Sequence, residues 1–155
     1  ERHYVPTERP LGYSLEAMQI RTQNGKQYVL CAWRRKYVRL TPEEQVRQTM
    51  LQCLVEQFDY PHNLIAVEVP IDVARIKKRC DAIVYNRQMQ ALMLIEFKAP
   101  SVQLTQEVFD QAAIYNRTLR VPYLMLSNGQ DTILAEILPT KYHFLDYIPN
   151  FTSLG

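Results

Sequence analysis

Alternating hydrophobic and polar positions predict short strands around two helices. The dipeptide Asn24-Gly25 is a strong hairpin signal, and the residues beside it predict paired strands at 15–22 and 27–33. A polar segment at 86–90 and the dipeptide Asn128-Gly129 predict two further turns. The apolar runs that predict the remaining strands lie at 64–69, 80–85, 91–98, 122–126 and 132–137.

The first helix is predicted to begin at residues 41–44. Thr41 suits the N-cap, Pro42 the first helical position, and Glu44 completes a capping box. A second helix is predicted over 105–119. The apolar stripe that continues the first helix, before Tyr60-Pro61 ends it, is Val46, Met50, Leu51, Leu54, Val55 and Phe58.

The order of these elements predicts an α/β fold. A hairpin, a helix, three strands, a helix and a strand pair together indicate a mixed sheet with helices on its faces. At 155 residues the chain is expected to form a single domain. Within it we expect an N-terminal arm and hairpin at 1–40, a core at 41–138 and an aromatic tail at 139–155 that packs on the body.

Composition narrows the class of protein. Hydrophobic residues make up 47% and charged residues 22%, which argues against disorder, collagen and coiled coil. No run approaches the roughly 18 apolar residues of a membrane-spanning helix, so no membrane partner is expected. Three cysteines without close pairs predict reduced thiols and a cytoplasmic location. The net charge of +2 makes no case for nucleic acid, which has to rest on local clusters.

Two predicted strands bring a pair of carboxylates together. If the strands at 80–85 and 91–98 form a hairpin whose turn centres between residues 88 and 89, Asp81 lies opposite Glu96. The two-residue period of a strand places Lys98 on the same face as Glu96. This set suits a hard cation, because Mg²⁺ typically takes one or two carboxylates and keeps several waters. The Phe97 carbonyl is a further candidate ligand.

Both predicted helices carry polar residues that invite two interpretations. Glu43 falls in the middle of the apolar stripe, so it forms either an ion pair with Arg47 or a third active-site carboxylate. Glu44, at the edge of the stripe, is explained by capping. In the second helix Gln111 and Tyr115 share a face, and a core aromatic with a polar edge is the favoured interpretation from spacing alone.

Basic residues gather at two places. One basic run directly precedes Asp81, where the charge of a phosphate would need neutralising, and consists of Lys77, Lys78 and Arg79. A second basic run lies at 34–36. A solvated surface is the alternative interpretation of both runs. Lys98 itself is a candidate for orienting or deprotonating an attacking water, or for stabilising charge on a phosphate.

The order of these motifs resembles the PD-(D/E)XK nuclease superfamily, and more narrowly the N-terminal nuclease domain of type I restriction enzyme R subunits. The resemblance runs from about residue 34 to 129. The blocks that carry it are Thr41-Pro42-Glu43-Glu44 with Arg47-Gln48, Lys78-Arg79-Cys80-Asp81, Ile95-Glu96-Phe97-Lys98-Ala99-Pro100, Gln111-Ala112-Ala113-Ile114-Tyr115-Asn116 and Ser127-Asn128-Gly129.

The resemblance implies a restriction-endonuclease-like mixed β-sheet flanked by helices, an αβββαβ core, to which this chain adds an N-terminal β-hairpin. It implies Mg²⁺-dependent hydrolysis of DNA, with Mn²⁺ as an alternative, and metal ligation by Asp81 and Glu96. Lys98 takes the role of the catalytic lysine, and Glu43 that of the helix carboxylate, with Glu44 one residue away. Gln111 and Tyr115 match the QxxxY element of R subunits, which favours a functional interpretation of this pair.

The expected function is therefore a Mg²⁺-dependent endonuclease acting on DNA. R subunits continue into helicase motors, and no Walker motif occurs in these 155 residues, so motor-coupled cleavage is not part of the expectation. The alternative is a nucleic-acid-binding or assembly module that keeps the nuclease fold with little activity. The expected partners are DNA and other restriction or helicase subunits, with a homodimer as one way to cut both strands.

Overall fold

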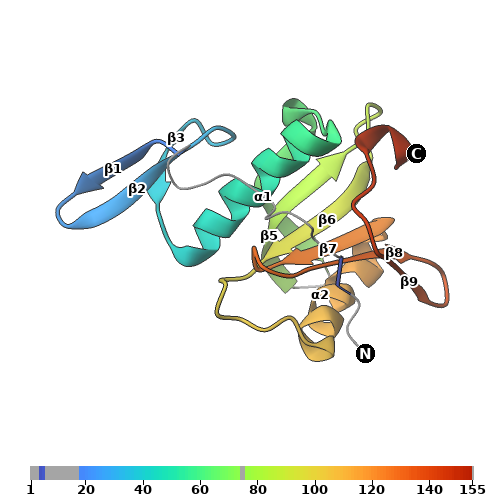
Figure 1. Ribbon diagram of the computed structural model, residues 1–155. Coiled ribbons are helices and arrows are strands. Elements are labelled where there is room, and N and C mark those ends of the chain that lie inside the picture. Colours follow the sequence, from blue (N-terminus) through green and yellow to red (C-terminus); the bar gives the residue numbers. More distant parts are fainter. Residues whose placement is uncertain (1–3, 6–17, 74–75, 155) are drawn as a thin grey trace.

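The computed structural model describes residues 4–5, 18–73 and 76–154. The described backbone forms a six-stranded sheet, a separate three-stranded sheet and two α-helices (Figure 1). The mixed α/β architecture predicted from the sequence is confirmed. The predicted arm at 1–12 lies outside the described residues except for Tyr4 and Val5, as does the start of the first predicted strand. Val5 is buried, and its backbone N–H donates to Thr132 O at 2.7 Å.

The six-stranded sheet follows the order β4-β5-β6-β7-β8-β9. Neighbouring strands are antiparallel except β6 and β7, which are parallel and joined by a helical crossover. The strands span β4 Ile65–Val73, β5 Ile76–Tyr85, β6 Ala91–Phe97, β7 Tyr123–Ser127, β8 Thr132–Ile137 and β9 Tyr142–Leu145.

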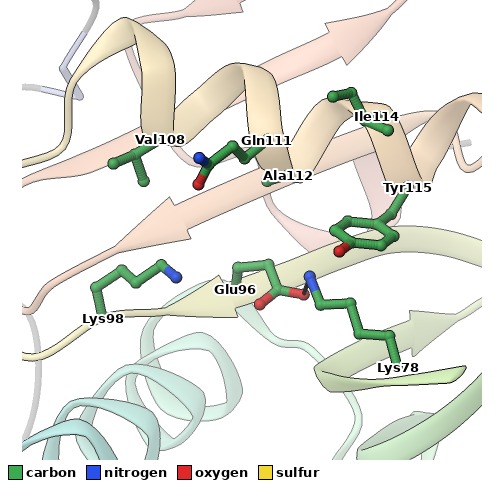
Figure 2. Close-up of a pocket in the computed structure, with 8 residues that line it drawn as sticks. All are labelled: Lys78, Glu96, Lys98, Val108, Gln111, Ala112, Ile114 and Tyr115. Atoms are coloured by element: carbon green, nitrogen blue, oxygen red, sulfur yellow. Dashed lines mark ion pairs between the residues drawn. The ribbon is translucent and has the colours of Figure 1, made fainter. Parts of the chain in front are cut away.

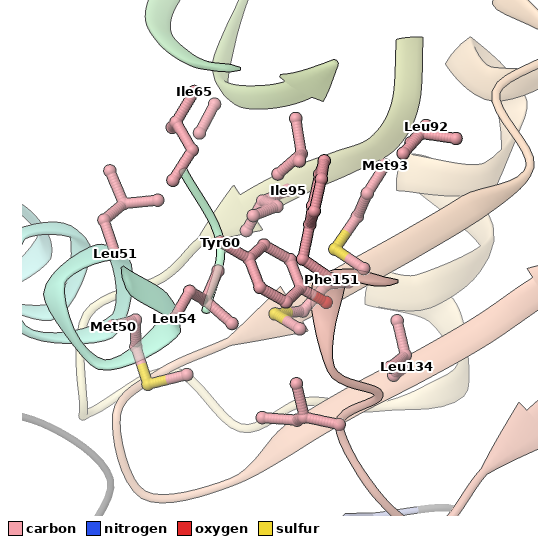
Figure 3. Close-up of a cluster of buried hydrophobic side chains, with 14 of the residues drawn as sticks. Met50, Leu51, Leu54, Tyr60, Ile65, Leu92, Met93, Ile95, Leu134 and Phe151 are labelled. Atoms are coloured by element: carbon pink, nitrogen blue, oxygen red, sulfur yellow. The ribbon is translucent and has the colours of Figure 1, made fainter. Parts of the chain in front are cut away.

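The two α-helices cover opposite faces of this sheet. α1 spans Pro42–Phe58 and α2 spans Gln106–Leu119. Side chains alternate along β6, so that Met93 and Ile95 pack with the α1 side while Leu94 packs with the α2 side. Phe151 from the C-terminal segment also packs on the α1 side. Its ring contacts the Tyr60 ring edge-on, with the ring centres 5.7 Å apart (Figure 3).

The predicted register of the central hairpin is confirmed. Ala82 pairs with Ile95 and Ile83 with Leu94, so that paired positions sum to 177 as expected. An irregularity between Val84 and Tyr85 absorbs one residue next to the turn. One more step along this register sets Asp81 opposite Glu96.

The three-stranded sheet has the order β1-β2-β3, with strands Ile20–Gln23, Lys26–Cys31 and Lys36–Arg39. Asn24 and Gly25 both adopt positive φ, as a tight hairpin turn requires, which confirms the hairpin. The predicted second strand was too long: β2 ends at Cys31, because residues 32–35 turn and Arg35 adopts φ 54°. β3 and β9 were not predicted.

Three further expectations can be compared with the structure. Cys31, Cys53 and Cys80 are all buried, as predicted, and none belongs to a disulfide. The C-terminal segment packs on the body through β9 and a short 3-10 helix at Phe151–Ser153. Within the described part of the chain, no helix has both the length and the apolar character to cross a membrane.

Candidate active site

A pocket of about 430 Å³ opens between α2, the beginning of β5 and the end of β6. From α2 the Tyr115 ring points toward the strands, and Lys78 extends from its strand toward this ring (Figure 2). The polar and apolar lining of the pocket comes from residues far apart in the sequence. The lining residues are Lys78, Glu96, Lys98, Val108, Gln111, Ala112, Ile114 and Tyr115.

Glu96 and Lys98 enter this pocket from the end of β6. Both line it, as the two-residue strand period predicted. Glu96 is only 6% exposed, whereas Lys98 is half-buried at the rim. The backbone N–H of Lys98 donates to Ser127 O at 2.9 Å, which ties the residue after β6 to the end of β7.

Asp81 lies on β5 beside these two residues. Its Oδ2 accepts a 2.7 Å hydrogen bond from the backbone N–H of Phe97, so the carboxylate is joined directly to the residue between Glu96 and Lys98. Its Oδ1 lies 3.8 Å from Nη1 of Arg47 on α1. Asp81 is therefore held from both the sheet and the helix.

The two carboxyls perturb one another. Burial, reinforced by the neighbouring Asp81 carboxylate, raises the pKa of Glu96 to about 7. Burial also raises the pKa of Asp81, although the hydrogen bond from Phe97 opposes the shift. Two desolvated carboxyls in one place are a costly arrangement for the chain alone, and a cation would relieve it.

Lys78 supplies part of the compensating charge. Its Nζ lies 3.3 Å from Glu96 Oε1 and 3.7 Å from the centre of the Tyr115 ring. The ammonium thus sits between a strand carboxylate and a helix aromatic (Figure 2). Lys78 was predicted as one of three phosphate contacts, and its neighbours Lys77 and Arg79 are exposed, as such contacts would be.

The donor set fits a hard divalent cation. Glu96 Oε1 is buried and accepts no hydrogen bond among the described residues, and its charged neighbour is the Lys78 ammonium at 3.3 Å. A metal ion that takes this oxygen as a ligand would take over the charge compensation that Lys78 now supplies. No three His, Cys, Asp or Glu side chains of the described ranges converge on one point. A cation held by Asp81 and Glu96 would fill its remaining positions with water or backbone oxygen, as Mg²⁺ commonly does. The Phe97 carbonyl stays a predicted ligand.

The structure separates the two glutamates at the start of α1. Glu44 was explained as half of a capping box, and only the other half forms: Thr41 Oγ1 accepts from Glu44 N at 3.0 Å. The Glu44 carboxylate is instead buried and accepts hydrogen bonds from Arg34, Arg47 and Gln48. Burial alone would raise the pKa of Glu44, but the bonds from the two arginines outweigh it and lower the pKa.

Glu43 is exposed and stands near the carboxylate pair. Partial burial and the Asp81 carboxylate raise the pKa of Glu43, while Lys98 opposes the shift, which places Glu43 within electrostatic reach of both. The predicted ion pair between Glu43 and Arg47 does not form among the described residues. Arg47 pairs instead with Glu44. Glu43 does not converge with Asp81 and Glu96 on one point, and its role as a third carboxylate of the site stays a prediction.

Sequence reasoning missed Glu68 and the full role of Arg47. The Arg47 guanidinium contacts Glu44 on its own helix, Glu68 on β4 and both the backbone and side-chain oxygens of Asp81 on β5. Glu68 adopts φ 53°, a left-handed conformation that is uncommon for a residue with a side chain. A charged residue between Val67 and Val69 in an apolar run was the signal that could have identified it.

The QxxxY pair reaches the same pocket from α2. Gln111 is exposed and Tyr115 half-buried, and both lie above Glu96 and Lys98 (Figure 2). The interpretation of Tyr115 as a core aromatic is therefore wrong, because its ring faces the pocket and carries the Lys78 ammonium.

Comparison with known proteins identifies the family of this chain. A sequence model of the family described as type I restriction enzyme R protein N terminus (HSDR_N) matches residues 42–149. The chain belongs to this family. The match runs from α1 through β9 and includes the carboxylates, lysines and QxxxY pair described above, whereas β1, β2 and β3 precede it.

Structural comparison agrees with membership of the R protein N-terminal family. A solved structure described as a fragment of an HsdR subunit of a type I restriction enzyme from Vibrio vulnificus YJ016 matches with a TM-score of 0.55 and 14% identity. The alignment covers 74% of this chain and 25% of that one, so the chain spans about a quarter of that relative. The likeness shows a shared fold. A search of curated proteins gives no match.

Proposed function

We propose that this member of the R protein N-terminal family is a Mg²⁺-dependent endonuclease that hydrolyses DNA phosphodiester bonds, with Mn²⁺ able to replace Mg²⁺. One observation carries the proposal: the Glu96 carboxylate is buried beside a second carboxylate, Asp81, and a lysine, Lys98, and its Oε1 accepts no hydrogen bond and has only the Lys78 ammonium, at 3.3 Å, as a charged neighbour. Two desolvated carboxyls and an ammonium at one pocket are the groups that hold a cation against a phosphate.

The proposal includes the fold class. The order α1, β4, β5, β6, α2, β7 supports a restriction-endonuclease-like αβββαβ core and membership of the PD-(D/E)XK superfamily. In that arrangement the candidate site lies where β5 and β6 leave the apolar centre of the sheet. The three-stranded sheet is an addition at the N-terminal side.

Each residue of the site has a distinct proposed task. Asp81 and Glu96, with the Phe97 carbonyl, supply oxygen ligands, and Mg²⁺ when bound offsets negative charge on the phosphate. Lys98 orients the attacking water and stabilises charge on the phosphate. Glu43 adds a third carboxylate at the open side. Gln111 and Tyr115 position the substrate from α2.

The proposed partner is DNA, with Lys77 and Arg79 contacting phosphates next to the site, where both side chains are exposed. From its membership of the R protein N-terminal family, we propose that the chain works with other restriction or helicase subunits. Cutting both strands would need a homodimer or two successive nicks. A cytoplasmic location stays a prediction.

The test is cleavage of plasmid and single-stranded DNA with Mg²⁺, Mn²⁺ or EDTA. Asp81→Ala and Lys98→Ala are compared with Asp146→Ala and Lys141→Ala, which remove the same groups from exposed positions away from the pocket. The proposal expects cation-dependent cutting by the wild type and both controls, and its loss in the two site variants. Cutting that persists in EDTA or in both site variants would overturn it.

A second candidate function is a nucleic-acid-binding or assembly module with little activity. The Lys78–Glu96 ion pair favours this candidate, because the Lys78 ammonium offsets the Glu96 charge without a metal ion. In the same assay this candidate predicts bound but intact DNA under every cation.

A further inference from the structure

The three-stranded sheet lies outside the residues that match the R protein family. Strands β1, β2 and β3 end at Arg39, and the match begins at residue 42. The sheet extends away from the six-stranded sheet at the N-terminal end of α1 (Figure 1). Its role therefore has to be argued from its own residues.

Charge is distributed very unevenly along the chain. Residues 18–40, which include the whole sheet, carry six of the chain's 18 basic residues and none of its 16 acidic residues. The small net charge of +2 conceals this segregation, because acidic residues elsewhere cancel it. A segment with this balance attracts polyanions whatever the total charge of the protein.

Strand pairing places three of these basic residues on one face. Arg21 pairs with Tyr28, which pairs in turn with Arg39, so the three side chains form a row across the sheet. Two residues farther along, Lys26 shares this face, as does Tyr37 on β3. We call these five residues the basic face.

The opposite face of the sheet is turned toward the protein. Val29 and Cys31 alternate with the residues of the basic face along β2, and each is only 1% exposed. Arg21, Lys26 and Arg39 are all exposed. The basic face is therefore the outward face. The sheet is amphipathic, with its apolar face on the protein and its charged face open to a partner.

The charges of the basic face are available for a ligand. Within the described ranges none of its three cations forms an ion pair with a carboxylate, whereas Arg34 is bound to Glu44. The Arg21 guanidinium lies 4.1 Å from the centre of the Tyr37 ring, which orients it without neutralising it.

The sheet is fixed to the body through the turn between β2 and β3. In the turn between β2 and β3, the Trp33 ring stacks on His62 at 4.5 Å and its Nε1 donates to His62 O at 3.1 Å. Arg34 in the same turn pairs with Glu44, in the first turn of α1 beside Glu43. The basic face is thus held at the end of α1 that carries a residue of the site.

We propose that the basic face binds the phosphate backbone of duplex DNA and holds it for the candidate active site. Arginine and lysine with tyrosine hydroxyls are a phosphate-binding set, and phosphate contacts fix a duplex in place without reading its sequence. The binding is therefore independent of sequence and sensitive to salt. This inference rests on the proposed function for the identity of the polyanion, and it adds a binding surface outside the family match.

The test measures affinity for a fluorescein-labelled 20-base-pair duplex by anisotropy, in EDTA so that no DNA is cut, over a salt series. The triple variant Arg21→Gln/Lys26→Gln/Arg39→Gln is compared with Arg87→Gln/Arg117→Gln/Lys141→Gln, which removes three exposed charges elsewhere. Each lost phosphate contact lowers the slope of log affinity against log salt by about 0.9. We expect a slope lower by about 2 to 3 in the first variant and little change in the control.

The outcomes separate this inference from the proposed function. Equal affinity and slope in the two triple variants, or binding to phosphatidylserine vesicles without binding to DNA, would overturn the basic face as a DNA surface. Cation-dependent cleavage by the wild type would still uphold the proposed function in either case. Loss of binding with an unchanged unfolding temperature supports the inference, since the substituted side chains are exposed and not part of the core.

Discussion

The ammonium of Lys78 lies 3.3 Å from Oε1 of Glu96, inside the pocket that we propose for a divalent cation. Three elements meet at this contact. Lys78 comes from β5 and Glu96 from β6, and the Tyr115 ring, whose centre is 3.7 Å from the ammonium, comes from α2. The chain thus places one of its own positive charges beside the buried oxygen. A cation that binds there has to compete with Lys78 or move it aside.

Removal of this charge is expected to tighten cation binding. Lys78→Met keeps a side chain of similar length, and Mn²⁺ affinity measured by calorimetry should rise about fivefold, because a partly exposed ion pair contributes on the order of 1 kcal/mol. Lys77→Met, at the exposed neighbouring position, is the control and should bind as the wild type does. Unchanged or weaker binding in Lys78→Met would contradict this role.

The raised pKa of Glu96 predicts a pH dependence of stability without divalent cations. The pKa is about 7 in the folded protein against an ordinary value of 4.5, so the folded state holds the proton more tightly. This contribution is full below pH 4.5 and is lost as pH rises through 7. From about pH 5 to pH 8, the free energy of unfolding measured with urea in EDTA should fall by on the order of 2 kcal/mol more in the wild type than in Glu96→Gln.

A matched control for this pH effect is Glu107→Gln, an exposed carboxylate in the first turn of α2. Its profile should follow that of the wild type. Parallel profiles for wild type and Glu96→Gln would show that the Glu96 proton is held no more tightly in the folded state than in the unfolded chain.

Substitution of the two neighbouring glutamates of α1 is expected to affect different properties, stability for Glu44 and DNA cleavage for Glu43. Glu44→Gln should lower the free energy of unfolding by about 3 kcal/mol, because it leaves Arg34 and Arg47 without their buried partner. Glu43→Gln should leave stability nearly unchanged and slow DNA cleavage by about tenfold or more, equivalent to ~1.4 kcal/mol of barrier. The reverse assignment of these two effects would show that Glu44 is the functional carboxylate.

Arg47 is expected to position Asp81 through its contacts with three elements. Arg47→Met should destabilise the fold by about 3 kcal/mol, because Glu44 and Glu68 lose a shared cation. In the double variant Glu44→Gln/Arg47→Met the loss should be smaller than the sum of the single losses. Arg117→Met, at an exposed position in the last turn of α2, serves as control. Additive losses measured by urea denaturation would contradict the coupling.

Much of the fold could be predicted from local chemistry. Thr41 and Pro42 fixed the start of α1, and the polar turn at 86–90 set the register of Ala82 with Ile95, because turn position and apolar faces constrain one another. β3 and β9 escaped prediction because each has four residues, too few for a clear period, and depends on pairing with β2 or β8.

The candidate site was predictable where spacing within one strand decides it, as for Glu96 and Lys98. It was not predictable where partners come from distant elements. Glu44 follows a capping pattern, but Arg34, ten residues earlier, and Arg47 bind its carboxylate in preference to the cap. The contact of Lys78 with Tyr115 likewise depends on how α2 packs on the sheet, which no local pattern contains.

The central claim is that Asp81, Glu96 and Lys98 form a cation-dependent site for DNA hydrolysis. The most direct measurement is the single-turnover rate of duplex cleavage over a Mg²⁺ series for wild type, Asp81→Asn and the exposed control Asp146→Asn. We predict a rate that rises and saturates with Mg²⁺ in wild type and control, and a rate lower by about 10²–10³-fold in Asp81→Asn. A rate independent of Mg²⁺, or equal in wild type and Asp81→Asn, would contradict the claim.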